Sequence, residues 1–382
     1  MKLSIIGAGH MGSAIAQHLI EHDHVSLVQI CDAHTRSLQK LHDTLDSPKL
    51  RSFQVDARDD RTMASILSDS DCIVAASAPA LNPALARIAL TIGSHFCDLG
   101  SSHAILQKEY KLNSLAEEHG LWVVPNCGLD PGLANMLALL GAQQFDQVES
   151  IRIRAGDVPL HPEPPFNFRI SWSSEKLLDD YTAPVVRLEN GVEIVEDPLS
   201  GIERIQFPGA FAQMEAFLTA GTLETVRTAS GPELQSIDHK TIRWPGHAEQ
   251  MQFLLALGFG EEKNIDVRTH LTYRDVLARR MRQRMGGDYQ DAVLLRITVC
   301  GRKDGRAQEL TYQMIDTFDT ERNMTSIRRC TSITAATIAM QLASGSVRKG
   351  GVGAPEGVVP LQAFHDSVLK AGLPITESWR DL

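Results

Sequence analysis

The sequence predicts an α/β protein: a Rossmann-like, doubly wound parallel sheet, followed by a second α+β domain with a mixed or antiparallel sheet. A glycine-rich turn lies between an apolar strand and an amphipathic helix at residues 5–19. Short apolar runs then alternate with helical segments, as in a parallel sheet with crossover helices. Beyond Gly132 the runs become rich in β-branched residues and are joined by hairpin turn sequences.

The length of 382 residues suits two packed domains. We expect the first domain at residues 1–130 and the second at residues 131–345. Residues 346–382 are expected to form a C-terminal segment that returns to the first domain.

Composition excludes several classes of protein. Hydrophobic residues make up 43% and charged residues 22%, as in globular proteins. No run approaches the roughly eighteen uncharged apolar residues of a membrane helix, and no secretory signal precedes the first strand. A net charge of −10 argues against a nucleic-acid partner. The 6 cysteines contain no CxxC pair and no zinc spacing, so we expect a cytoplasmic protein without a metal site.

The first strand, Lys2–Ile6, leads into a turn with the spacing GxGxxG. In this motif Gly7 makes the tight turn, Gly9 admits a pyrophosphate and Gly12 lets the helix pack on the strand. The free N–H groups at the start of the helix then bind the anion. The candidate cofactor-binding residues of the turn are Gly7, Gly9, His10, Met11 and Gly12. The alternative is a tight turn in an unrelated α/β protein.

Asp32 ends the next apolar run, Val25–Cys31, twenty residues after Gly12. A carboxylate at this position accepts hydrogen bonds from the adenosine ribose and repels the extra phosphate of NADP. Arg36, a cation that could otherwise pair with that phosphate, lies one turn into the following helix. NAD is therefore expected as the cofactor.

Further strands are predicted at residues 52–55, 72–76, 95–99 and 121–124, with helices at 82–93 and 104–119. Ligands of such sheets lie beyond the carboxyl ends of the strands. The loops there supply the remaining cofactor candidates: Ser77, Ala78, Pro79, Gly100 and Cys127. Each of these also fits an ordinary loop, and Cys127 fits a packing role.

The second part of the chain mixes strands and helices. Strands are predicted at residues 148–154, 202–207, 237–244, 292–301 and 310–319, with hairpin turns at 190–191 and 302–305. Helices are predicted at residues 174–181, 248–257, 274–285, 331–344 and 360–371. The sequence therefore predicts a second sheet that is antiparallel or mixed.

Three stretches carry a family resemblance. NCGLDPGLANMLA (126–138), FRISWSSEKLLDDYTAPVVRLENG (168–191) and KTIRWPGHAEQM (240–251) resemble the saccharopine dehydrogenase family. Residues 158–165, 214–217 and 301–305 are most similar to the lysine 6-dehydrogenases of bacteria and archaea within it. The tetrad at residues 129–132, LDPG, has the form of saccharopine dehydrogenases proper.

The resemblance implies a Rossmann-like NAD-binding domain and a second domain that binds substrate and forms a homodimer. It implies NAD-dependent oxidation of an amino acid, with L-lysine oxidised at the ε-carbon. The products are the 6-semialdehyde, which cyclises to piperideine carboxylate, and ammonia. One alternative is a saccharopine or opine-type dehydrogenase that cleaves a secondary amine. Another is an NAD-binding regulator without catalysis.

This chemistry needs a group that holds the substrate carboxylate and a group that accepts a proton. Arg243 is the candidate for the carboxylate, because arginine binds carboxylates through two hydrogen bonds; its alternative is a surface ion pair. His247 and Lys240, from the same motif, are candidate proton acceptors. His247 also fits a hydrogen-bonding role at a helix start.

Acidic residues complete the candidate site. Asp130 follows the sixth strand, at the edge where nicotinamide is expected, and is assigned as base or ammonium ligand. It also fits a helix cap. Glu215 is a further candidate for the cationic end of the substrate. Asp157 is assigned a substrate contact by the resemblance alone.

Overall fold

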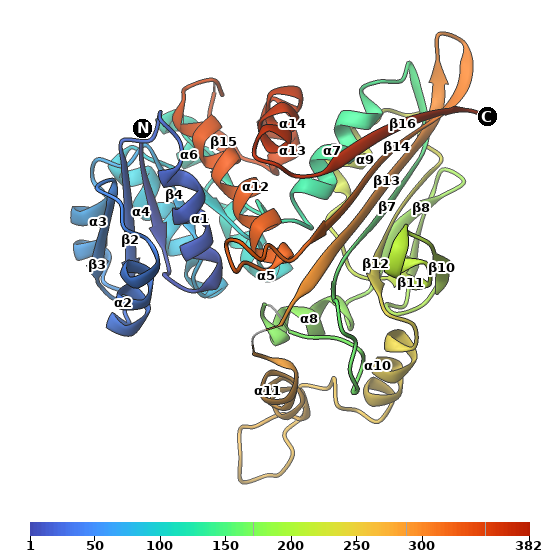
Figure 1. Ribbon diagram of the computed structural model, residues 1–382, viewed down its shortest axis with the longest axis horizontal. Coiled ribbons are helices and arrows are strands. Elements are labelled where there is room, and N and C mark those ends of the chain that lie inside the picture. Colours follow the sequence, from blue (N-terminus) through green and yellow to red (C-terminus); the bar gives the residue numbers. More distant parts are fainter. Residues whose placement is uncertain (171, 288, 348) are drawn as a thin grey trace. The chain divides into compact units, whose positions relative to one another are not determined.

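The structure, a computed structural model, describes residues 1–170, 172–287, 289–347 and 349–382 (Figure 1). The chain divides into two compact units. Residues 1–136 and 328–373 form the first, and residues 137–327 and 374–382 form the second. The sequence predicts that all of residues 346–382 return to the first domain. In the structure, residues 374–382 belong to the second unit and contain strand β16 (Ile375–Asp381).

The first unit contains a 7-stranded sheet in the order β15-β6-β5-β4-β1-β2-β3. All strand pairs of this sheet among the described residues are parallel, and the direction of winding reverses between β1 and β4. The strands are β1 (Lys2–Ile6), β2 (Leu27–Asp32), β3 (Leu50–Gln54), β4 (Cys72–Ala75), β5 (His95–Asp98), β6 (Trp122–Val124) and β15 (Gly351–Val352). The predicted doubly wound sheet is confirmed.

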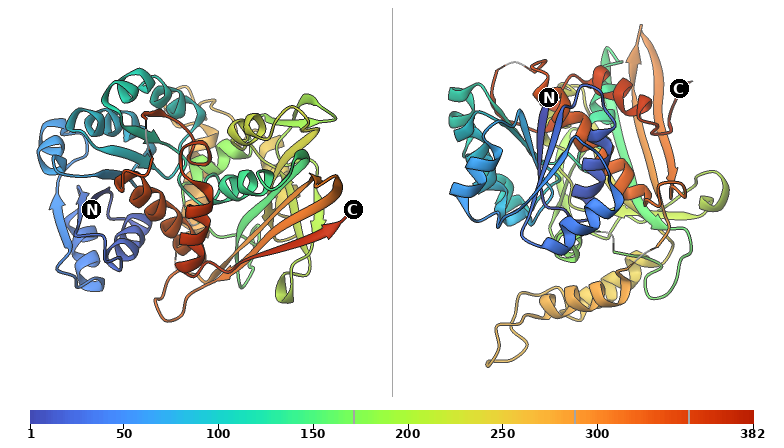
Figure 2. Two further views of the ribbon diagram at one scale, coloured as in Figure 1. Left: turned by 90° about the horizontal axis from the view of Figure 1, so that it is seen from above. Right: turned by 60° about the vertical axis from the view of Figure 1, so that its left-hand side comes forward.

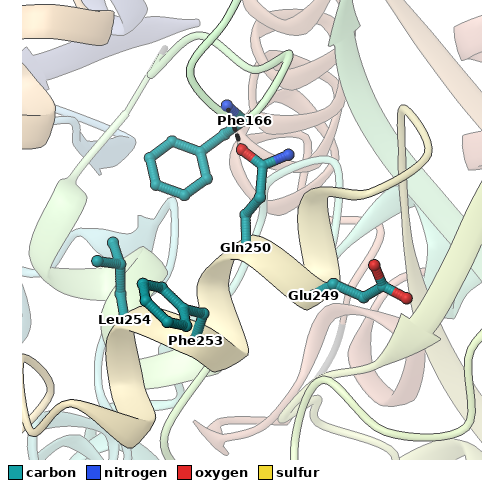
Figure 3. A pocket seen from close by; sticks show the side chains of 5 residues that line it. All are labelled: Phe166, Glu249, Gln250, Phe253 and Leu254. Atoms are coloured by element: carbon teal, nitrogen blue, oxygen red, sulfur yellow. Dashed lines mark hydrogen bonds between the residues drawn. The ribbon is translucent and has the colours of Figure 1, made fainter.

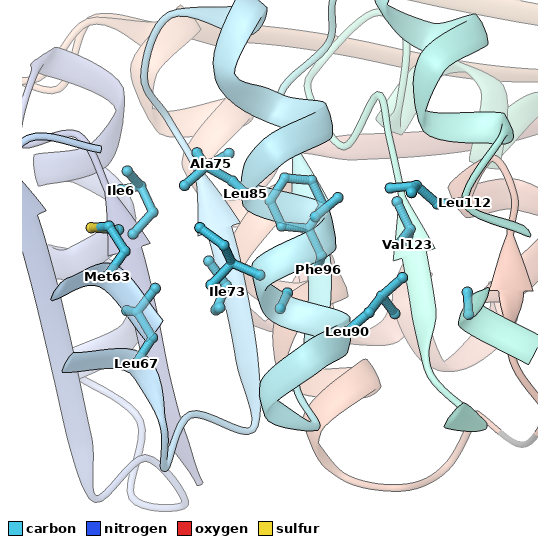
Figure 4. Packing of buried hydrophobic residues seen from close by; sticks show 14 of the residues in the cluster. Ile6, Met63, Leu67, Ile73, Ala75, Leu85, Leu90, Phe96, Leu112 and Val123 are labelled. Carbon is cyan, nitrogen blue, oxygen red and sulfur yellow. The ribbon is translucent and has the colours of Figure 1, made fainter. Parts of the chain in front are cut away.

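The helices of the first unit are α1 (His10–Ile20), α2 (Thr35–Thr44), α3 (Asp60–Leu67), η1 (Pro79–Leu81), α4 (Asn82–Ile92), α5 (His103–Tyr110), α6 (Asn113–His119), α13 (Pro355–Val358) and α14 (Leu361–Lys370). Two helices, α7 (Leu133–Ala142) and α12 (Ser326–Ala343), contain residues of both units. On one face, Ile73 and Phe96 of the sheet pack with Leu85 and Leu90 of α4 in a buried cluster (Figure 4). The single helix predicted at residues 104–119 is two helices, α5 and α6.

The second unit contains a mixed sheet in the order β10-β11-β12-β7-β13-β14-β16, with the hairpin β8–β9 paired to β12. Its strands are β7 (Gln147–Pro159), β8 (Val185–Glu189), β9 (Val192–Glu196), β10 (Glu203–Ile205), β11 (Met214–Leu218), β12 (Ser236–Arg243), β13 (Asp291–Lys303), β14 (Arg306–Thr317) and β16 (Ile375–Asp381). Only the β12–β7 pair of this sheet is parallel among the described strands. Both predicted hairpin turns are present, with Gly191 and Gly305 at positive φ.

Two apolar clusters lie on opposite faces of this sheet. The helices of the unit are α8 (Ser174–Asp180), η2 (Gly209–Phe211), α9 (Glu224–Ala229), α10 (His247–Ala256) and α11 (Tyr273–Met285). Phe217 of β11 packs with residues of α8, α10 and α11, whereas its neighbour Ala216 belongs to a cluster formed by strand residues. Helix α11 and the loop before it project from the unit (Figure 2). None of the described helices is long and apolar enough to cross a membrane.

Candidate functional site

The glycine turn of the first unit fits a dinucleotide. A Cβ on Gly12 would lie 1.8 Å from the carbonyl oxygen of Gly7, so the helix packs this closely only on glycine. At Gly9, the exposed N-cap of α1, a Cβ would meet nothing within 4 Å. Open space thus adjoins the N–H groups of the first helical turn, which have no partners within the helix. His10 is exposed and Met11 is half-buried beside this space.

Asp32 ties the end of β2 to this turn. One of its carboxylate oxygens accepts from the N–H of Ala8 at 2.7 Å, and the other accepts from the N–H of His34 at 2.7 Å. The carboxylate is half-buried, and its remaining lone pairs are suited to hydroxyl donors. Arg36 is exposed in the first turn of α2.

The loops after β4 and β5 border the same edge of the sheet. The Ser77 hydroxyl is buried and has no hydrogen-bond partner among the described residues, so a polar group of a ligand would satisfy it. Ala78 is exposed and Pro79 begins η1. Gly100 has φ of 116°, and a Cβ there would lie 3.3 Å from the Asn126 side-chain oxygen.

Cys127 and Asp130 follow β6. Cys127 is completely buried and its thiol donates to the carbonyl oxygen of Val124 at 3.2 Å. Its surroundings therefore indicate packing, not cofactor contact. Asp130 is half-buried in a tight loop, where the N–H of Gly128 donates to the carbonyl oxygen of Pro131 at 3.1 Å. The loop presents Asp130 beyond the carboxyl end of the parallel sheet.

In the second unit, strand register brings Glu215, Arg243 and Asp157 to one face of the sheet. Glu215 of β11 pairs directly with Arg243 of β12. The parallel register between β12 and β7 continues from the pair Thr241 and Ala155 toward Arg243 and Asp157. Because paired residues on adjacent strands project to the same face, these three side chains form a row.

Arg243 is buried within this row. Its Nη1 lies 3.3 Å from Oδ1 of Asp157, and the guanidinium carbon lies 4.4 Å from the centre of the Phe168 ring. Burial lowers the pKa of Arg243, but the Tyr181 side chain and the charge of Asp157 outweigh this effect and raise the pKa above its usual value, so the cation is retained. The Nε atom is buried and has no hydrogen-bond partner among the described residues. One donor of the guanidinium therefore lacks an acceptor.

His247 is a poor proton acceptor. It is completely buried, its Nδ1 lies 3.1 Å from the carbonyl oxygen of Phe166 and its Nε2 lies 3.0 Å from the Tyr181 hydroxyl. Burial, and then the charge of Arg243, lower the pKa of His247 to about 3. The neutral ring donates from Nδ1 to the carbonyl oxygen, and its Nε2 accepts a hydrogen bond from the Tyr181 hydroxyl. These surroundings fit a residue that positions Tyr181, and the catalytic role of His247 stays a prediction.

Lys240 lies on the opposite face of β12, because it is three residues from Arg243 and side chains alternate along a strand. Its Nζ is 2.7 Å from a carboxylate oxygen of Glu203 and donates to the carbonyl oxygen of Gly201 at 2.7 Å. Arg154 joins the same ionic network through Asp238 and Glu203. The structure therefore does not bring Lys240 together with Arg243, and the role of Lys240 as proton acceptor stays a prediction.

Glu215 caps helix α10. Its two carboxylate oxygens accept from the N–H groups of Gly246 and Ala248, each at 2.8 Å. A carboxylate at this helix terminus is stabilised by the free N–H groups and the helix dipole. Its position therefore explains the burial of Glu215 without a substrate.

Sequence reasoning missed Tyr181 and Phe168, the aromatic partners of His247 and Arg243. Both lie within the stretch at residues 168–191, but no sequence spacing indicates that residues 168 and 181 lie close to residue 243 in the fold. Among the described residues, no group of three or more His, Cys, Asp or Glu side chains is placed to hold a metal ion.

Comparison with known families matches both parts of the chain. Residues 3–124 match the family described as "Saccharopine dehydrogenase NADP binding domain". Residues 128–371 match "Saccharopine dehydrogenase C-terminal domain".

Relatives among curated proteins are distant. Alpha-aminoadipic semialdehyde synthase of Bos taurus is 22% identical over 271 residues, which cover 67% of this chain but 28% of that protein. The NADP(+), L-glutamate-forming saccharopine dehydrogenase of Schizosaccharomyces pombe is 20% identical over 271 residues, covering 68% of this chain and 58% of that protein. The chain thus spans less than two thirds of either relative.

A solved structure agrees over nearly the full length. Apo saccharopine dehydrogenase (L-Glu forming) of Saccharomyces cerevisiae superposes with a TM-score of 0.80 at 16% identity, covering 99% of both chains. At this identity the agreement concerns the fold.

Proposed function

Because this chain belongs to the saccharopine dehydrogenase family, we propose that it is a nicotinamide-dependent oxidoreductase that acts at a carbon–nitrogen bond of an amino acid. The observation that carries the proposal is the buried guanidinium of Arg243, whose Nε lacks an acceptor among the described residues. The first unit adds a glycine turn with open space at Gly9 for a pyrophosphate. One unit therefore has the features of a cofactor site and the other has a ready donor for a carboxylate.

Each residue of the proposed site has its own role in binding or proton transfer. Bound nicotinamide supplies the hydride acceptor. Arg243 binds the α-carboxylate through Nε, while Asp157 balances its charge and Phe168 holds the guanidinium plane. Asp130 binds the substrate nitrogen or accepts its proton, since His247 and Lys240 are both otherwise engaged.

We propose L-lysine as the substrate, oxidised at the ε-carbon to the 6-semialdehyde with release of ammonia. The segments at residues 158–165, 214–217 and 301–305 support this choice by their resemblance to lysine 6-dehydrogenases. The second candidate is saccharopine, favoured by the LDPG tetrad at residues 129–132 and by the relative from Schizosaccharomyces pombe, which is named a saccharopine dehydrogenase. The two substrates share an α-carboxylate, so Arg243 serves either.

We propose NAD as the cofactor, although the matched family is described as NADP-binding. The carboxylate of Asp32 is held toward the glycine turn by the N–H of Ala8. A phosphate on the adenosine ribose would meet this charge, and Arg36 is one turn into α2.

We also propose that a second copy of the chain covers the outer face of α10. This face carries a shallow pocket of about 320 Å³ lined by Phe166, Glu249, Gln250, Phe253 and Leu254 (Figure 3). Phe253 is 64% exposed and Leu257 is 61% exposed, which is unusual for neighbouring large apolar side chains. The following segment is acidic at residues 261–262 and 266, whereas α11 carries arginines at 279, 280, 282 and 284. A twofold axis lets such opposite charges pair between copies.

The substrate proposal predicts that the wild-type chain forms NADH from L-lysine, and that Arg243→Lys raises the KM for lysine at least about tenfold. In this variant, the lysine side chain at residue 243 keeps the positive charge beside Asp157 but lacks the planar pair of N–H donors of arginine. Steady-state NADH formation measures both, and Arg154→Lys, an equally buried arginine on the opposite face, is the control. If NADH forms from saccharopine but not from L-lysine, lysine is excluded as the substrate. If Arg243→Lys and Arg154→Lys have the same KM for lysine, Arg243 does not bind the carboxylate.

The cofactor proposal predicts that the wild type prefers NAD over NADP and that Asp32→Asn narrows this preference at least about tenfold. Asparagine keeps an acceptor for the N–H of Ala8 but removes the charge. Dinucleotide titration by fluorescence gives the ratio of the two dissociation constants, with Asp56→Asn, a half-buried acid after β3 that pairs with Arg58, as control. Equal binding of both cofactors by the wild type would refute the argument.

The interface proposal predicts a mass of two chains in light scattering for the wild type, and of one chain for Phe253→Asp at the same concentration. A buried apolar contact cannot accommodate an unpaired carboxylate. The control is Leu382→Asp, which introduces the same charge at an exposed apolar residue outside this face. A monomeric wild type would contradict the proposal.

A further inference from the structure

Asp98 is the point at which the loops of the cofactor edge meet. It ends β5 and is completely buried. Its Oδ1 accepts from the N–H of Gly100 at 2.6 Å and from the N–H of Asn126 at 3.2 Å. One carboxylate oxygen thus holds the segments that follow β5 and β6.

The backbone at these contacts needs such support. Gly100 has φ of 116° and Asn126 has φ of 67°, both in the left-handed half of the backbone map. The main-chain oxygen of Asp98 additionally accepts from the N–H of Cys127 at 2.7 Å. The conformation of both loops therefore depends on residue 98.

A second acid, Glu109 of α5, lies against Asp98 in the interior. Glu109 is 0% exposed, and no N–H or O–H donor of the described residues reaches either of its carboxyl oxygens or Oδ2 of Asp98. Two adjacent buried carboxylates whose facing oxygens have no donors do not both remain ionised in a protein interior. One proton must lie between them.

The proton belongs to Glu109. Burial, followed by the charge of Asp98, raises the pKa of Glu109 to about 10. The Asp98 carboxylate has two backbone N–H donors, whereas Glu109 has no donor among the described residues, so the charge is better stabilised on Asp98. The Glu109 hydroxyl thus donates to Asp98.

We propose that Asp98 and protonated Glu109 are positioning residues that hold the loops after β5 and β6 in the shape that receives the nicotinamide half of the dinucleotide. Neither residue is exposed, so both act through Gly100 and Asn126. This inference rests on the proposed function for the identity of the ligand. The contacts that Asp98 and Glu109 make within the unit do not depend on the proposed function.

The test compares Glu109→Gln with Glu109→Leu. Glutamine keeps a donor toward Asp98 without a charge, whereas leucine has a similar volume and no donor. Amide hydrogen exchange in the ligand-free chain, followed by mass spectrometry of peptides covering residues 99–101 and 125–127, reports on the loops. We expect exchange at least tenfold faster in the leucine variant and nearly unchanged exchange in the glutamine variant. NADH affinity should fall at least tenfold in the leucine variant alone.

The control is Glu356→Leu, which removes another buried acid of the same unit, one that contacts Asn135. It should leave exchange in both peptides unchanged. Unchanged exchange in Glu109→Leu would overturn the inference, as would equal effects of leucine and glutamine. If the wild type binds no dinucleotide, the proposed function fails, and the exchange pattern still decides whether the pair holds the loops.

Discussion

The approach of Gly12 to the carbonyl oxygen of Gly7 is the constraint on which the first unit depends. A Cβ at residue 12 would lie 1.8 Å from that oxygen, so α1 begins directly against the end of β1. This places the free N–H groups of the helix beside the open space at Gly9 and beside Asp32, whose carboxylate binds the N–H of Ala8. The anion site and the acid proposed to select the cofactor are thus consequences of one backbone contact.

The second unit depends on placing ionisable groups inside the protein with partners. Glu215 caps α10, and Asp291 accepts from the N–H groups of Ser326 and Ile327 at the start of α12. Arg243 is balanced by Asp157, which lies in the same row across the sheet. Buried charges are tolerated when each has donors or a counter-charge. Among the described residues, the buried Nε of Arg243 has no such partner. For this reason we propose that Nε donates to the substrate.

Sequence patterns predicted the elements that have a strong hydrophobic signal. The turn at residues 7–12 and strand β1 lie where they were expected, because apolar runs and glycine spacing are local properties. Strand β16 was not predicted, since its side chains are mostly exposed and show no alternation; it is held by pairing with β14. The side-by-side placement of Lys240 and Arg243 in one motif was misleading, because alternation along β12 sends them to opposite faces. The Asp98–Glu109 pair depends on contact between a strand and a helix, which sequence spacing does not reveal.

Dinucleotide binding by Gly9→Val tests the central claim most directly. Residue 9 has φ of −73°, and a Cβ there meets nothing within 4 Å, so the fold accepts a side chain that would fill the space assigned to the pyrophosphate. We predict a free energy of unfolding within about 1 kcal/mol of the wild type, the size of an N-cap effect. NADH affinity, measured by fluorescence titration, should fall at least about 100-fold, which is roughly 2.7 kcal/mol. Wild-type affinity in this variant would contradict the account, because the open space at Gly9 would then not be where the cofactor binds.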